Sequence, residues 1–96
     1  MDEIIKIVTD VTSVTAEEII AKRGNVDTQE ARMIFILIAK DHGYSDYEIS
    51  YYLHRTQVSI WKTRKYAEEY GKYSTAFLVK YQHAQAKCEA GKRQIN

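Results

Sequence analysis

A cluster of basic side chains gives the clearest chemical signal in the sequence. The segment 53–67 contains four basic residues and no acidic one, namely Arg55, Lys62, Arg64 and Lys65. Clustered cations of this kind bind phosphate groups, and DNA-binding domains carry them on one face. On charge alone, a solvated helix face explains the cluster equally well. The wider balance agrees with a local basic region, since residues 1–44 hold five Lys/Arg and eight Asp/Glu, and residues 45–96 hold nine and five.

The residue types that can perform catalysis or bind metals are present, but their spacing fits neither a catalytic site nor a metal site. The three histidines lack ligand spacing, and the single cysteine, Cys88, excludes a multi-cysteine zinc site and an internal disulfide. Neighbouring glutamates at 17–18 and 68–69 point in different directions on a helix. The four glycines are scattered, with no Gly-rich phosphate loop. We therefore expect no enzyme, no cofactor and no metal site.

Composition indicates one small globular domain of 96 residues, with 45% hydrophobic and 28% charged residues. The longest apolar run, Met33 to Ala39, is far shorter than the roughly 20 residues of a membrane span. The first apolar residues lie among charges, unlike a signal peptide. We expect a cytoplasmic protein without a membrane partner, associated with the nucleoid if it binds DNA.

The elements that position the basic cluster are predicted to be helices. The chain has no proline and no alternating apolar pattern, and apolar residues recur at three- and four-residue steps. Capping boxes at Thr15 and Ser45, and a similar pair at Asp27 and Glu30, mark helix starts. An all-α bundle of five to six helices is expected. The predicted helices cover 2–13, 16–22, 28–41, 45–53, 57–70 and 74–87, followed by a frayed tail.

The fourth and fifth predicted helices resemble a helix-turn-helix. Only His54 and Arg55 separate them, and Thr56 can cap the second helix. Ile49, Leu53 and Ile60 fall where the two helices would cross. Residues 2–71 are therefore predicted to form a DNA-binding domain, and residues 72–96 a C-terminal helix and tail.

The fifth helix should present its basic side chains to solvent. If Ile60 faces the core, Val58, Lys62 and Lys65 lie about 140–160° away at 100° per residue. The start of the second helix in such a motif meets base edges in the major groove. The residues so placed are Thr56, Gln57, Val58, Ser59 and Lys62. Gln57 can pair with adenine, Val58 can contact a thymine methyl, and Lys62 can reach guanine or phosphate.

Seven segments together suggest a family. They are IIKIV (4–8), VTAEEII (14–20), AKR (21–23), AR (31–32), AK (39–40), SDYEI (45–49) and RTQVSI (55–60). In order and spacing they resemble the C-terminal DNA-binding domain, domain IV, of the bacterial replication initiator DnaA, a helical fold related to the Trp repressor. The resemblance covers residues 2–70. The ATPase module of that initiator is absent from this chain, which would be either a fragment or a free-standing relative.

The resemblance implies double-stranded DNA as the partner, in replication initiation or its control. It places Arg55, Ser59 and Lys40 at DNA-contacting positions, and it brings the Lys22-Arg23 loop to a neighbouring minor groove. The sequence departs from the family at Gly24, which replaces an arginine, and at residues 56–58, which replace Asp-His-Thr. A transcriptional regulator or a protein-interaction adaptor on the same scaffold is the alternative.

Aromatic residues have two interpretations each. Tyr51 and Tyr52 are expected to pack half-buried, whereas Tyr47 lies near the predicted groove and is a candidate for DNA contact. Trp61 is either a stacking surface or a packing residue, as an anchor in the core or as a support for the basic face. In the last helix, Phe77, Tyr81, Ala84 and Cys88 form one stripe. This stripe either folds back on the core or binds a second copy or another protein.

Overall fold

The computed structural model describes residues 1–22 and 24–95, with the side chains of residues 1–22 and 24–90. The helices are α1 (Asp2–Thr12), α2 (Ala16–Ile20), α3 (Val26–Asp41), α4 (Asp46–Leu53), α5 (Gln57–Tyr73) and α6 (Thr75–Ile95). No strand occurs in these described ranges, so the predicted all-α fold is confirmed. None of the helices described here is both long enough and apolar enough to cross a membrane.

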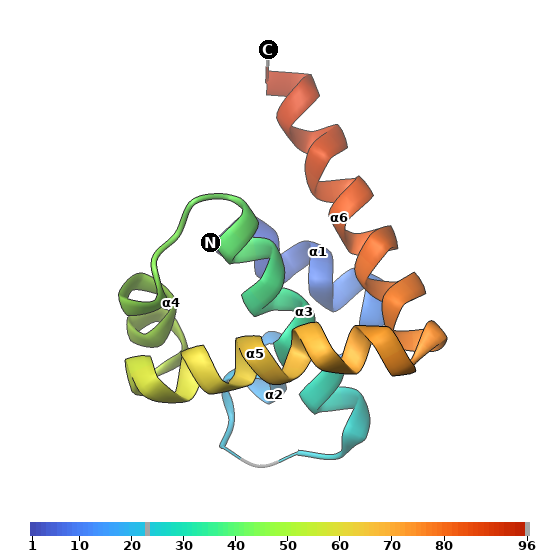
Figure 1. The fold of residues 1–96 in the computed structure, drawn as a ribbon. Coiled ribbons are helices and arrows are strands. Elements are labelled where there is room, and N and C mark those ends of the chain that lie inside the picture. Colours follow the sequence, from blue (N-terminus) through green and yellow to red (C-terminus); the bar gives the residue numbers. More distant parts are fainter. Residues whose placement is uncertain (23, 96) are drawn as a thin grey trace.

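The central element of the core is α3. Its middle is apolar nearly all round, so it must be covered on every side. The other five helices contact it (Figure 1). In Figure 1, α5 crosses in front of α3. Helix α4 lies beside the first turns of α5, and α6 begins at the other end of α5. The fully buried side chains of α3 are Ala31, Ile34, Phe35, Ile36, Ile38 and Ala39.

Predicted caps begin three of the helices. The Thr15 and Ser45 side chains each accept a hydrogen bond from the backbone N–H three residues later, and Glu18 and Glu48 accept from the cap backbone in return. Thr56 Oγ1 accepts from Ser59 N at 3.1 Å and starts α5. These local side-chain bonds confirm the helix starts that the sequence predicts.

Several helix boundaries differ from the prediction. Helix α2 ends at Ile20, two residues before Lys22. Helix α3 begins at Val26, because Asn25 rather than Asp27 is its cap and accepts from Thr28 N at 2.9 Å. Helix α5 continues through Gly71 to Tyr73, since a glycine in a helix weakens it without breaking it.

The C-terminal helix folds back on the core. Ser74 Oγ accepts from Phe77 N at 3.2 Å and helps to begin α6. Helix α6 contacts α1, α3 and α5 and continues to Ile95, beyond the predicted end at Lys87. Phe77 and Ala84 are buried, and the Tyr81 hydroxyl donates to Asp41 Oδ2 at 2.7 Å. The stripe suggested for a partner is therefore occupied by the chain's own core.

Phe77→Ala is expected to destabilise the protein by about 3–5 kcal/mol, because the ring is 1% exposed and its removal leaves a cavity. Urea denaturation followed by circular dichroism measures this loss. Val79→Ala, at a side chain 58% exposed on the same helix, is the control and should cost less than about 0.5 kcal/mol. Equal stability of the two variants would show that α6 does not belong to the core.

Candidate nucleic-acid interface

Helices α4 and α5 form a helix, a tight turn and a second helix that pack together. His54 begins the turn in the left-handed region, with φ 56° and ψ 47°, which is uncommon for a residue with a side chain. Arg55 N then donates to Ser50 O at 2.8 Å. Ile49, Leu53 and Ile60 are fully buried at 0% exposure. The predicted helical junction is thus confirmed, with histidine in the position where a glycine is the commoner residue.

The outer face of α5 carries the side chains predicted to be there. Ile60 and Ala67 are buried, whereas Val58 is 61% exposed and Lys62 and Lys65 are exposed. Lys65 lies 3.8 Å from Glu68 and 6.0 Å from the centre of the Trp61 ring. Lys62 has no carboxylate within ion-pair distance in the part of the chain that the structure describes. Of the two outward cations on α5 that the sequence singles out, Lys62 and Lys65, Lys62 is the less neutralised.

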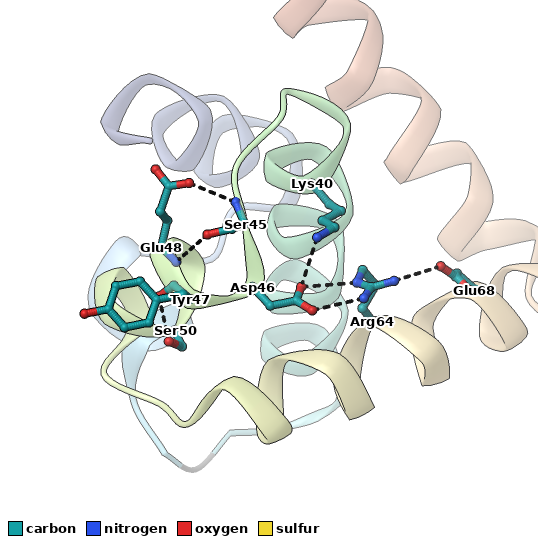
Figure 2. A network of polar contacts seen from close by, with 8 residues as sticks. All are labelled: Lys40, Ser45, Asp46, Tyr47, Glu48, Ser50, Arg64 and Glu68. Atoms are coloured by element: carbon teal, nitrogen blue, oxygen red, sulfur yellow. Dashed lines mark hydrogen bonds and ion pairs between the residues drawn. The ribbon is translucent and has the colours of Figure 1, made fainter.

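An open cleft of about 400 Å³ separates the starts of α4 and α5. Its lining comprises Ser45, Asp46, Tyr47, Gln57, Val58 and Trp61. Tyr47 is 62% exposed and points away from the helical body (Figure 2). The amide of Gln57 can form hydrogen bonds with the edge of a base, and the neighbouring aromatic and aliphatic surfaces can contact a thymine methyl group. The first turn of α5 carries no acid, so the N–H groups at this helix start favour an anion.

Asp46 ties the start of α4 to α3 and α5. Its carboxylate lies 3.1 Å from Arg64 Nη2 and 3.5 Å from Lys40 Nζ, and Arg64 Nη1 lies 3.7 Å from Glu68 (Figure 2). The hydrogen bond from Arg64, with the nearby positive charges, lowers the pKa of Asp46 although partial burial opposes the shift. Lys40 and Arg64 therefore neutralise an internal carboxylate, which the sequence pattern did not indicate.

Stability is expected to fall in acid partly through Asp46. Because the folded-state pKa of Asp46 is depressed, its contribution is complete above its ordinary pKa near 3.8 and is lost as the pH falls through the folded-state value. Asp46→Asn should cost about 1 kcal/mol at pH 7 and progressively less below pH 4. Urea denaturation at several pH values tests this, with the exposed Asp10→Asn as control. A constant difference from the wild type across that range would contradict it.

Two arginines cover the end of α2. Arg32 Nε donates to Ile19 O at 2.7 Å, and the Nη2 atoms of Arg32 and Arg55 donate to Ala21 O at 2.7 and 2.6 Å. These bonds satisfy carbonyl groups that a helix end leaves without partners. Desolvation lowers the pKa of both guanidinium groups, and the charge of Arg55 lowers that of Arg32 further. Arg55, predicted to contact DNA, is thus half-buried and also holds the turn to α2.

The role of Arg32 at the end of α2 is not evident from the sequence pattern. The sequence feature that points to burial of Arg32 is its position immediately before the apolar run of α3. In the structure Arg32 is only 8% exposed. A buried arginine requires hydrogen-bond acceptors, and the exposed end of a five-residue helix supplies them. Arg32 therefore positions the α2 end against the helix-turn-helix.

A second open cleft, of about 430 Å³, lies at the start of α5 and is lined by Lys22, His54, Arg55, Thr56 and Ser59. It combines cations and hydroxyl groups with the N-terminal end of α5. The structure thus places Lys22 beside the turn, whereas Arg23 of the predicted minor-groove loop lies outside the described residues. At Gly24, an added Cβ would come within 2.6 Å of Thr28 Cγ2, so the side chain of Thr28 would have to move.

The two tyrosines expected to pack behave differently. Tyr52 is half-buried, stacks on Phe35 at 5.6 Å and donates to Asp2 Oδ1 at 2.6 Å, and burial with this bond raises its pKa to about 12. The packing predicted for Tyr51 is wrong, since its side chain is 78% exposed. Tyr51 lies two residues after Ile49, about 200° around the helix from that buried position.

Comparisons of this chain with protein-family models, curated proteins and solved structures find no match. Among the described residues, no group of His, Cys, Asp or Glu is placed to hold a metal ion.

Proposed function

We propose that the protein binds double-stranded DNA, with the start of α5 in the major groove. The observation that carries this proposal is the exposed first half of α5. There Lys62, which has no carboxylate partner among the described residues, lies on the same outer face as Val58. In helix-turn-helix proteins this part of the second helix meets the bases. The packing of α4 against α5 supports the same orientation.

The proposed contacts divide into base contacts and backbone contacts. Gln57 and Val58 face base edges from the cleft between α4 and α5, with Tyr47 at its rim. Lys22, Thr56 and Ser59 surround the start of α5 and approach a backbone phosphate. Lys62 and Lys65 add positive charge along the outer face. Arg55 supports this surface from beneath, through its bonds to the end of α2.

The biological role proposed is replication initiation or its control, from the resemblance to DnaA domain IV. Residues 56–58 differ from the family at base-contacting positions, so a different target sequence is expected. A transcriptional regulator would use the same surface. An adaptor acting through the α6 stripe receives less support, because Phe77 and Ala84 are buried in the chain itself.

Fluorescence anisotropy with a randomised duplex pool and an initiator-box duplex tests DNA binding. With about four to six phosphate contacts, affinity should fall roughly 100- to 1000-fold between 50 and 200 mM salt. Preferred binding of one duplex would identify a sequence reader. Absence of binding to every duplex at the lower salt concentration would contradict the proposal.

A further inference from the structure

A third cleft lies between α3 and α5 and, like the cleft at the start of α5, is lined in part by Arg55. It has a volume of about 320 Å³, and its polar lining comes from Gln29, Arg32, Arg55, Lys62, Thr63 and Tyr66. Three of these residues are cationic and none is acidic. Met33 completes the lining with an apolar surface. Volumes of this size accommodate small molecules, and a few convergent polar groups determine which chemistry they bind.

The positive charge in this cleft is not balanced by the protein. Neither Arg32 nor Arg55 has a carboxylate within ion-pair distance among the described residues, and the same holds for Lys62. The Nη2 atoms of Arg32 and Arg55 donate to backbone carbonyl groups of α2 and of Ala21, the residue that follows it, and these carbonyls are neutral acceptors. Arg55 Nε is buried and has no hydrogen-bond partner in the residues that the structure describes. An unpaired guanidinium N–H away from water carries a free-energy cost that an anionic acceptor removes.

We propose that this cleft binds the oxyanion of a small free molecule, a phosphate or carboxylate group, with Arg32, Arg55 and Lys62 as its charged partners. Gln29, Thr63 and Tyr66 supply further hydrogen-bonding groups around it. Met33 and the ring of Tyr66 provide apolar surface for the body of the molecule. The site is formed within a single chain and does not depend on DNA binding.

Phenyl phosphate is a suitable probe, because it joins a phosphate group to a small ring. Thermal unfolding is compared in phenyl phosphate and in sodium chloride of equal ionic strength, without DNA. Saturable binding at about ten times Kd should raise Tm by about 5 °C or more. Lys62→Gln should lose most of this increase. Its side chain is exposed, so the variant is expected to fold, and Lys6→Gln on α1 is the matched control.

Side-chain Nε–H resonances of Arg32 and Arg55 provide the second readout. The proposal predicts saturable shifts of both resonances on titration with phenyl phosphate. It is overturned if Lys62→Gln keeps the full increase in Tm, or if neither resonance shifts. It is also overturned if duplex DNA shifts these resonances and phenyl phosphate does not, because the oxyanion would then be a backbone phosphate.

Discussion

Lys62→Glu is expected to lower the affinity for duplex DNA about 10- to 100-fold at low salt and to leave the fold intact. The change removes an exposed cation that has no carboxylate partner within the described part of the chain, and it adds a negative charge to the face proposed to meet phosphate. The salt dependence should weaken as well, because fewer counterions are released on binding. Anisotropy titration at two salt concentrations measures both effects.

Lys6→Glu makes the same change of charge at an exposed position of α1 and is the matched control. It should reduce affinity only slightly, through the lower net charge. Two outcomes would contradict this account. One is equal loss of binding in both variants, which would remove the specific role of α5, and the other is an unfolded Lys62→Glu protein, which would show that α5 faces the opposite way.

Ile60→Asp is expected to cost about 4 kcal/mol or more and to unfold the domain. Ile60 is 0% exposed at the junction of α4 and α5, where the apolar side chains of Ile49 and Leu53 are also fully buried. Burial of an unpaired charge is among the most destabilising single changes. Loss of the helical circular dichroism signal, or a much lower midpoint of urea denaturation, would be the observed result.

Val58→Asp provides the control for Ile60→Asp, since it places the same residue two positions earlier on the exposed face of α5. It should remain folded and lose DNA binding. Similar thermal stability of the two variants would contradict the orientation of α5 on which the proposed interface depends.

The sequence predicts the helix-turn-helix well because local interactions determine it. Ser45 and Thr56 cap their helices through backbone N–H groups only three residues away. The facing of α5 follows from helical geometry once Ile60 is placed inward. Helix ends are harder to predict, because they depend on contacts from elsewhere. Helix α2 ends at Ile20, where Arg32 of α3 and Arg55 of the turn take its carbonyl groups.

Contacts from distant parts of the chain also explain why the sequence pattern does not distinguish cations available to DNA from cations that already have a partner in the protein. At the level of sequence, Lys40 is a candidate for DNA contact through the family resemblance, and Arg55 and Lys62 are candidates through their place in the basic segment as well. In the fold, Lys40 pairs with Asp46 and Arg55 binds the end of α2, and only Lys62 remains without such a partner among the described residues. A cation's availability therefore depends on acceptors that tertiary packing brings close, which spacing along one helix does not reveal.

The most direct measurement is the change in backbone amide resonances when a duplex is added to the labelled protein. We expect the largest changes at residues 45–48 and 54–62, which surround the starts of α4 and α5, and small changes along α6. Changes concentrated on α6, or none in residues 54–62 under conditions where the duplex is bound, would contradict the claim that α5 reads DNA.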